Sequence, residues 1–324
     1  MRADPGPVAV IIPAWNASAS IARAIASALA EPEVGDIIVV DDASTDDTAT
    51  AAAAADDGSG RLRIIRQALN RGPAAARNIG IAATSRPFVA VLDSDDFLLA
   101  GRFAALLAVP GWDAIADNLV FVSEAAAVGF DPGQVRQFER RIERLQLAGF
   151  ALGNISTPGR PRGELGFAKP VVRRSFLERH QLRYDETLRL GEDYALYTRI
   201  LARGGVFLTT RRCGYVAIER PSSLSGSHAT ADLFALAEAD GRLLAEPGLD
   251  SAGREAVARH MAHVMAKAQH RAFLDLRRSQ GMVPAVLSAL ARPQQVPALA
   301  RAISRDKWQG LVPARPPEVR YLFS

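Results

Sequence analysis

Several features that define common classes of protein are missing from this sequence. Its 324 residues include a single cysteine, Cys213, which excludes an intramolecular disulfide and a metal site built from several cysteines. No apolar run approaches the ~20 residues that a membrane-spanning helix needs. Residues 1–7 contain two prolines and an aspartate but no apolar stretch, so we expect no signal peptide and predict a cytoplasmic protein.

The motifs of several functional classes are also missing. No GxGxxG loop follows the first apolar run, which disfavours a dinucleotide oxidoreductase, and no P-loop motif occurs. There is no nucleophile elbow of the GxSxG type. The five histidines show no zinc-like spacing with a third ligand. Aromatic residues make up only 6% of the chain and no nucleic-acid-binding motif is present, so we expect no nucleic-acid partner.

The composition is that of a globular protein with an uneven distribution of charge. Hydrophobic residues make up 48% and charged residues 23%, which argues against disorder, collagen and coiled coil. Residues 1–210 hold 23 basic and 25 acidic side chains, whereas residues 251–324 hold 12 basic and 4 acidic ones, a net charge of +8. The basic segment fits either a solvated helical face or a surface that meets anionic lipid headgroups.

The first hundred residues alternate between short apolar runs and helical patterns. Runs rich in Val and Ile predict strands at residues 8–12, 37–40, 62–65 and 88–92. Helical patterns separate these runs at residues 21–29, 45–55 and 73–83. Ser18 or Ser20 suits the N-cap of the first helix, and Pro73 suits the first position of the third. Strands that alternate with helices predict a doubly wound, mostly parallel α/β sheet flanked by helices.

The rest of the chain is less regular. We expect helices at 134–147, 170–180 and 191–203. The first of them is amphipathic, because its face carries Val135, Phe138, Ile142 and Leu145. A stretch rich in Gly, Pro and Arg at 154–166 predicts a loop, and residues 206–218 predict one or two strands. From about 229 to about 305 the pattern is helical, before a proline-rich tail.

Polar residues follow three of the predicted strands, at 15–16, 41–42 and 93–96. Because ligands bind outside the carboxyl ends of the strands in such a sheet, we expect these groups to converge on one cleft. Asp93, Asp95 and Asp96 place three mutually repelling carboxylates within four residues. A hard cation such as Mg²⁺ or Mn²⁺ would neutralise them. The alternative is an acidic turn that caps the next helix.

Three further patterns allow more than one interpretation. Asp41 and Asp42 fit a ribose or base contact, a phosphoacceptor pocket, or the N-cap of the following helix. Arg77, near the start of a predicted helix, fits a diphosphate site or a surface ion pair. Glu192 and Asp193 open another predicted helix, where acidic residues are ordinary, but a carboxylate there also fits a general base.

Five motifs, taken together, resemble family 2 of the inverting, nucleotide-sugar-dependent glycosyltransferases, which have the GT-A fold. They are VIIPAWN at 10–16, VVDDASTDDT at 39–48, NRGPAAARN at 70–78, VLDSDD at 91–96 and GEDY at 191–194. Each motif is weak alone, but their order and spacing match across about residues 1–205. A further block, GFAKPVVRR at 166–174 with RYDE at 183–186, is similar to bacterial exopolysaccharide glycosyltransferases of the succinoglycan type.

The resemblance implies a nucleotide-sugar site at the carboxyl edge of the sheet. The residues that it implies there are Pro13, Ala14, Trp15, Asn16, Asp42, Arg77, Asp93 and Arg220. Trp15 would stack on the base, usually uracil, while Arg77 would approach the diphosphate and Asp93 would face the ribose or a metal-bound water. Asp42 would contact the base through its side chain.

The resemblance also implies a metal, a catalytic base and an acceptor contact. Asp95 would bind Mn²⁺ or Mg²⁺ directly, with Asp96 as a competing ligand. Asp193 would be the base, supported by Glu192 in acceptor binding, and Lys169 would contact the acceptor.

The chain departs from the family pattern near the metal. Family members often carry a His in an HxxSxS segment there, whereas this chain has Arg220 in RPSSLS at 220–225. Either His228, close by in the sequence, replaces that ligand, or Arg220 binds phosphate instead.

These features predict a GT-A catalytic domain at 1–225, with a nucleotide-sugar half at 1–110 and an acceptor half at 111–225. A helical, basic C-terminal region would follow at 226–324. The implied reaction moves a sugar, from a UDP-sugar in most family members, to a hydroxyl of a lipid-linked exopolysaccharide oligosaccharide. Residues 251–324 would then contact anionic lipid at the inner face of the plasma membrane.

Two alternatives belong to other functional classes. A nucleotidyltransferase should carry a GxGTR loop after the first strand, and this chain has Pro13-Ala14-Trp15-Asn16 there. A non-catalytic, glycosyltransferase-like binding module in a polysaccharide assembly complex needs neither the acidic cluster nor Asp193.

Overall fold

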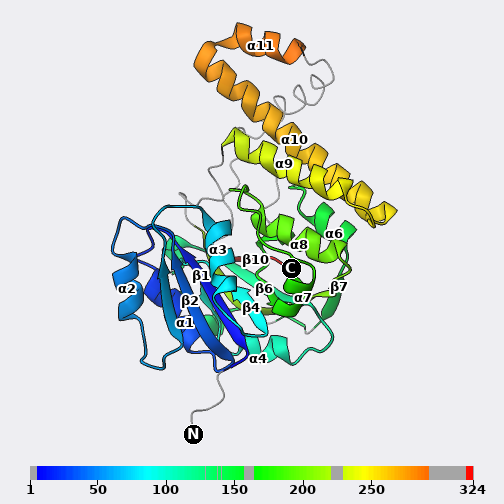
Figure 1. Cartoon of the computed structure of the whole chain (residues 1–324). Coiled ribbons are helices and arrows are strands. Elements are labelled where there is room, and N and C mark those ends of the chain that lie inside the picture. Colours follow the sequence, from blue (N-terminus) through cyan, green and yellow to red (C-terminus); the bar gives the residue numbers. More distant parts are fainter. Residues whose placement is uncertain are drawn as a thin grey trace. The chain divides into compact units, whose positions relative to one another are not determined.

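The computed structural model describes residues 6–127, 129–136, 138–139, 141–156, 164–219, 229–291 and 319–323 (Figure 1). The chain divides into two compact units. The first comprises Met1–Gln146, Leu165–Pro221 and Glu318–Ser324, and the second Leu147–Glu164 and Ser222–Pro317. The sequence-based division at residue 225 assigned 147–164 to the catalytic domain. The structure groups this segment with the second unit, because α6 (Leu147–Gly153) packs against α10 (Ser251–Gln280).

The first half of the first unit follows the alternation expected from the sequence. Its strands are β1 (Val8–Ala14), β2 (Val34–Asp41), β3 (Leu62–Arg66) and β4 (Phe88–Val91). Its helices are α1 (Ile21–Leu29), α2 (Thr48–Ala54) and α3 (Pro73–Ala82). The four strands are parallel, in the spatial order β3-β2-β1-β4 (Figure 1). Right-handed crossovers therefore place α3 on the face of the sheet opposite α1 and α2.

Close packing of α3 on β1 brings the start of this helix to the carboxyl edge of the sheet. Residues 8–12 of β1 are completely buried, as expected for a strand covered on both faces. A Cβ atom at Gly80 of α3 would lie only 2.3 Å from Cγ2 of Ile11, so no larger side chain fits at this position without a shift of the helix.

The second half of the unit extends the sheet with mixed pairings. Its elements are β5 (Phe97–Leu98), α4 (Arg102–Leu107), β6 (Ala114–Ser123), α5 (Glu124–Ala127), β7 (Ile142–Leu145), β8 (Val171–Arg173), α7 (Arg174–Arg179), α8 (Glu192–Ala202), β9 (Phe207–Glu219) and β10 (Val319–Tyr321). Strand β8 lies antiparallel between β4 and β6, and β6 runs parallel to β9. The result is a mixed, mostly parallel sheet flanked by helices, which confirms the predicted fold class.

One predicted helix in this half is wrong, and another is shorter than predicted. Instead of a helix at 134–147, the structure has a 3₁₀ turn at Pro132–Gln134 and strand β7, which pairs antiparallel with the edge of β9. The apolar residues of the expected helix do not form one buried face. Val135 is buried in a core cluster with residues of β6 and β9, whereas Ile142 is 45% exposed. The predicted helix at 170–180 starts only at Arg174, because the buried residues Val171 and Val172 pair with both β4 and β6.

Strand β10 was not predicted at all. Its residues Val319–Tyr321 pair antiparallel with Val120–Val122 of β6. The ring of Tyr321 packs edge-on against Phe138, with their centroids 5.0 Å apart. The end of the chain therefore completes the first unit rather than extending the helical region.

A buried ion pair joins α4 to β6. Arg102 is 1% exposed and Asp117 is 2% exposed. The guanidinium of Arg102 donates to both carboxylate oxygens of Asp117 at 2.9–3.1 Å, and its Nη2 also donates to the carbonyl oxygen of Lys169 at 2.5 Å. The pair thereby positions the segment just before β8.

The second unit is helical. It contains α6, α9 (Thr230–Ala245), α10 and α11 (Met282–Leu290) (Figure 1). These helices confirm the helical pattern from 230 to 290, while the remainder of the expected helical stretch lies outside the described residues. Helix α10 is about 45 Å long and packs on α9, where His260 Nδ1 and Asp240 Oδ2 are 2.6 Å apart. Within the described residues, no helix combines the length and the apolar character required to cross a bilayer.

Candidate active site

Hydrogen bonds of Asn16 join the loops that follow β1 and β2. Asn16 has a positive φ of 49°. Its backbone N–H donates to Oγ of Ser44 at 3.0 Å, and its side-chain oxygen accepts from the N–H of Thr45 at 2.9 Å. Pro13 and Ala14 lie in register with the end of β2. Asn16 therefore connects the loops, whereas Trp15, 49% exposed, leaves its indole open to solvent.

Asp42 organises the loop that leads into α3. Its N–H donates to the carbonyl oxygen of Ala14 at 2.8 Å. Its two carboxylate oxygens accept from the backbone N–H groups of Arg71 at 2.9 Å and Gly72 at 2.7 Å. The sequence assigned this side chain to the nucleobase. That role stays a prediction, while the structure shows that the side chain holds the loop from which α3 starts.

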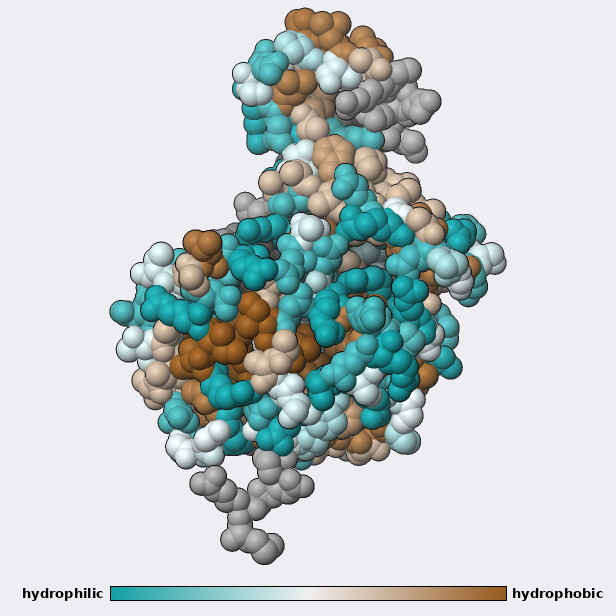
Figure 2. Space-filling view, in the orientation of Figure 1, coloured by the Kyte–Doolittle hydropathy of each residue, from teal (hydrophilic) through white to brown (hydrophobic). Residues whose placement is uncertain are grey.

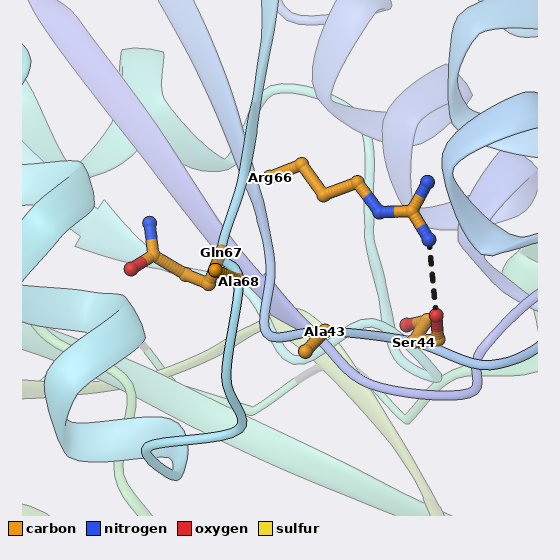
Figure 3. Close-up of a pocket in the computed structure, with 5 residues that line it drawn as sticks. All are labelled: Ala43, Ser44, Arg66, Gln67 and Ala68. Atoms are coloured by element: carbon orange, nitrogen blue, oxygen red, sulfur yellow. Dashed lines mark hydrogen bonds between the residues drawn. The ribbon is translucent and has the colours of Figure 1, made fainter.

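A shallow pocket lies beside this loop at the carboxyl ends of β2 and β3 (Figure 3). Its lining residues are Ala43, Ser44, Arg66, Gln67 and Ala68. In Figure 3 the Arg66 side chain extends toward Ser44, and its Nη2 donates to the Ser44 carbonyl oxygen at 3.2 Å. Sequence reasoning did not single out Arg66 or Gln67, because β3 ends without a polar motif of the kind that follows β1, β2 and β4.

Farther along the same edge, Arg77 of α3 meets three carboxylates. Its Nη2 donates to Oδ1 of Asp93, directly after β4, at 3.1 Å. Its Nη1 donates to Oε1 of Glu192 at 2.5 Å and lies 3.6 Å from Oδ1 of Asp193. The side chain of Arg77 is only 5% exposed. Burial alone would lower the pKa of Arg77, but the charges of Asp193, Glu192 and Asp93 outweigh it and raise this pKa well above its usual value.

Lys169 bridges the two aspartates of this cluster. Its Nζ lies 2.9 Å from Oδ2 of Asp93 and 2.9 Å from Oδ2 of Asp193, and its side chain is 7% exposed. Burial opposes ionisation of Lys169 and Asp93, but the surrounding opposite charges prevail. They raise the pKa of Lys169 and lower the pKa of Asp93. Two buried cations and three partly buried carboxylates thus form one ionic cluster.

Helix α8 delivers the last two members of the cluster. Gly191 precedes it with a left-handed φ of 73°, which favours glycine. Glu192 and Asp193 form its first turn, as the sequence predicted, and carboxylates are favourable at this end of a helix dipole. Asn78 of α3 anchors the preceding loop, because its side chain donates to the carbonyl oxygen of Tyr184 and accepts from the N–H of Tyr184, each at 2.9 Å.

Asp95 and Asp96 differ in burial and in their hydrogen bonds. Asp96 is 5% exposed, and its oxygens accept from the Tyr215 hydroxyl at 2.7 Å and from the Ile218 N–H at 2.8 Å. Burial, together with the charges of Asp95 and Asp93, raises the pKa of Asp96 well above its usual value. Asp95 is partly exposed, and its backbone carbonyl accepts from Arg23 at 2.8 Å. Asp96 thus joins the end of β4 to β9 through hydrogen bonds, while the side chain of Asp95 lies nearer to solvent.

Three tyrosines complete the site and were not predicted. The Tyr215 hydroxyl accepts from the N–H of Asp93 at 3.1 Å while donating to Asp96. The guanidinium of Arg77 lies over the ring of Tyr184, 5.3 Å from its centroid. The Tyr197 hydroxyl is 3.5 Å from Oδ1 of Asp193. Only five tyrosines occur in the chain. The sequence could have indicated Tyr184, because it lies within the RYDE motif at 183–186.

Two predicted site residues, Arg220 and His228, lie outside the described residues. Among those that are described, no three His, Cys, Asp or Glu side chains lie together in a way that would hold a metal ion by themselves.

The fold and the site define a class of protein. The mixed, mostly parallel sheet flanked by helices, with polar side chains gathered at its carboxyl edge, is a GT-A-like fold. A glycosyl transferase family 2 profile matches residues 9–145.

Curated relatives match along nearly the whole chain. Succinoglycan biosynthesis protein ExoU of Rhizobium meliloti (strain 1021) is 48% identical over 330 residues, which cover 99% of this chain and 96% of that protein. ExoO of the same strain is 33% identical over 88% of this chain and 82% of that protein. The chain belongs to glycosyl transferase family 2.

Solved structures share the fold. A structure of S. aureus TarS 1–349 in complex with UDP-GlcNAc matches with a TM-score of 0.60 and 19% identity, over 92% of this chain and 81% of that one. The mannosyltransferase PcManGT from Pyrobaculum calidifontis, in complex with GDP-Man and Mn²⁺, matches with a TM-score of 0.55 and 18% identity, over 95% and 88%.

Proposed function

We propose that this glycosyltransferase moves a sugar, with inversion, from a UDP-sugar to a hydroxyl of a lipid-linked exopolysaccharide oligosaccharide. The observation that carries the proposal is the ionic cluster in which the buried cations Lys169 and Arg77 hold the Asp193 carboxylate beside Asp93. The similarity to ExoU and ExoO, both named for succinoglycan biosynthesis, supports an exopolysaccharide product.

The donor would occupy the carboxyl edge of β1, β2 and β4. Trp15 would stack on the base, and Pro13, Ala14 and Asp42 would border it, next to the pocket that contains Arg66. Arg77 would meet the diphosphate, since a buried guanidinium offers paired N–H donors to phosphate oxygens. The UDP-GlcNAc complex of TarS supports a uridine donor.

The end of β4 fits a divalent cation that is bound partly by substrate. Asp95 would supply a carboxylate oxygen, since its side chain lies nearer to solvent than that of the buried Asp96. Mn²⁺ or Mg²⁺ would neutralise charge on the departing diphosphate. The Mn²⁺ complex of PcManGT supports this assignment.

The residues of the chain supply acid–base chemistry and orientation. Asp193 would take the proton of the acceptor hydroxyl. At the same time the hydroxyl oxygen would bond to the anomeric carbon of the donor sugar, and the bond from that carbon to the diphosphate oxygen would break. Attack from the face opposite the leaving group turns an α-linked donor into a β-linked product. Glu192 and Lys169 would keep Asp193 oriented and border the acceptor, since both belong to the same cluster. Arg77 would stabilise the leaving nucleoside diphosphate.

The acceptor side of the proposal concerns the membrane. A lipid-linked oligosaccharide is presented at the inner face of the plasma membrane, and the net charge of +8 in residues 251–324 would attract this region to anionic lipid. The enzyme would then act as a peripheral membrane protein.

The test is Asp193→Asn in the full-length protein. With UDP-sugars and Mn²⁺, we measure the UDP released when the sugar is transferred to water or to an acceptor. We expect this rate to fall by about 10²–10⁴-fold, because the base is lost. Binding of the UDP-sugar, followed by its effect on the melting temperature, should change little. Asp57→Asn, in an exposed loop, is the matched control and should retain wild-type turnover. A wild-type protein that binds the donor without ever releasing UDP would be a binding module.

A further inference from the structure

Helix α11 exposes an apolar face to solvent. Its exposed side chains are Met282 at 53%, Val283 at 70%, Val286 at 40%, Leu287 at 61% and Leu290 at 59%. Figure 2 shows apolar surface gathered on this helix, at the upper end of the view. Successive residues of a helix are about 100° apart, so these five positions fall within roughly 140° of its circumference. The helix therefore has one broad apolar face and not scattered apolar residues.

The opposite side of α11 is packed. Ala285 is only 1% exposed, and the helix packs against α10. No charged residue occurs from 281 to 291. A helix on the surface of a water-soluble unit ordinarily carries charged side chains on its outer face, so an uncharged, exposed face of this kind indicates an interaction surface.

The last part of α10, which leads into this helix, is basic. Arg271, Arg277 and Arg278 are exposed near the end of α10, which is joined to α11 through the single residue Gly281. Asp275 is the only acidic residue from 256 to 291, and it accepts a hydrogen bond from Thr230 Oγ1 at 2.5 Å. An apolar face bordered by arginines complements a surface with an apolar interior and anionic headgroups.

We propose that the apolar face of α11 lies in the interfacial region of an anionic lipid bilayer, with Arg271, Arg277 and Arg278 at the headgroup level. An amphipathic helix of this kind binds through its buried apolar area and through attraction between its cations and anionic lipid. A second copy of the chain fits less well, because it would bring a second set of arginines against the first. The inference deepens the proposed membrane contact and rests on that part of the proposed function, but not on the catalytic chemistry.

The experiment is flotation of the full-length protein, without donor or acceptor, with two kinds of vesicle. One contains phosphatidylcholine alone and the other contains phosphatidylcholine and phosphatidylglycerol. We expect binding to the anionic vesicles that weakens as salt rises, because salt screens the arginines. Equal binding to both kinds of vesicle, or no binding to either, overturns the proposal.

Two double variants separate the apolar contribution from the charged one. Leu287→Glu/Leu290→Glu should lower partitioning by at least tenfold, since both side chains would leave the lipid and add negative charge. Arg277→Gln/Arg278→Gln should lower it by about fivefold per arginine, the equivalent of ~1 kcal/mol each near an anionic surface. Ile142→Glu is the matched control, because Ile142 is an exposed apolar residue of the first unit, 45% exposed. Its partitioning should stay at the wild-type level.

The remaining outcomes of these experiments show whether the face of α11 binds lipid or a second copy of the chain. Variants of α11 that float as well as wild type refute the docking surface. A dimer that Leu287→Glu/Leu290→Glu converts to a monomer, without vesicle binding by wild type, assigns the face to a second copy instead. Release of UDP from a UDP-sugar is measured in parallel: if it fails while flotation succeeds, the proposed chemistry is wrong and the docking surface stands.

Discussion

At the scale of single residues, Lys169 has the most constrained position in the site. Its ammonium is equidistant from Asp93 and Asp193, at 2.9 Å from each. The acceptor contact that the resemblance implies for Lys169 stays a prediction. Its ion pairs with Asp93 and Asp193 also suit a residue that positions the carboxylate proposed as the base. A base that is misplaced by about 1 Å can cost 10²-fold in rate.

Lys169→Met should therefore lower kcat by about 10²-fold while the KM for the UDP-sugar changes little. The measurement is steady-state UDP release with varied donor. Lys169→Arg should recover part of the rate, because a second cation restores the pairing with Asp193. If Lys169→Met instead leaves kcat unchanged and raises only the KM of the acceptor, Lys169 is an acceptor-binding residue and not a positioning one.

At the scale of elements, the site depends on how β8 enters the sheet. This short strand lies between β4 and β6, and Lys169 precedes it by two residues. Arg102 of α4 holds the Lys169 carbonyl while it pairs with Asp117 of β6. One buried guanidinium thus links a helix, a strand and the segment that carries the lysine.

Arg102→Met should destabilise the first unit by about 3–5 kcal/mol, because Asp117 would remain as a buried, unpaired charge. Urea unfolding, followed by tryptophan fluorescence, measures the loss. The double variant Arg102→Met/Asp117→Leu removes both charges and should recover a large part of the stability. A single variant as stable as wild type would show that the pair contributes nothing to the fold.

The elements that sequence analysis located correctly are those with a local signal. Strands β1 to β4 are short apolar runs rich in Val and Ile, and α8 begins after Gly191 with two acidic residues. The elements that it missed are stabilised by distant partners. Strand β7 forms because β9 offers a free edge to 142–145, and β10 forms because β6 has room for a strand from the end of the chain. Neither edge is visible in the local periodicity.

At the scale of the whole molecule, donor binding should appear as stability. A ligand at 100 times its dissociation constant adds ~2.7 kcal/mol to the free energy of unfolding, or roughly 5–10 °C in melting temperature for a unit of this size. We expect UDP-sugars to give this shift only with Mn²⁺ or Mg²⁺, because the proposed cation would lie between the Asp95 carboxylate and the diphosphate, which otherwise repel each other.

Asp95→Ala is the variant for this measurement, since Asp95 is the proposed carboxylate ligand. It should abolish the metal-dependent part of the shift while the unliganded protein melts near the wild-type temperature, because Asp95 is partly exposed. Asp56→Ala, an exposed aspartate before β3, is the matched control and should keep the full shift. A shift that is equally large with EDTA would contradict metal dependence.

The sequence by itself determined the α/β class, the first four strands, the family and the edge of the sheet where the polar motifs meet. These follow from local apolar periodicity and from short motifs whose order the chain preserves. It also named Arg77, Asp93, Lys169, Glu192 and Asp193, whose catalytic roles stay predictions. Only the tertiary structure decided that these five side chains form one ionic cluster, and that Asp96 and Asp42 have partners within the chain. Such pairings join residues that are far apart in sequence, and their geometry is set by packing between elements, which no local pattern records.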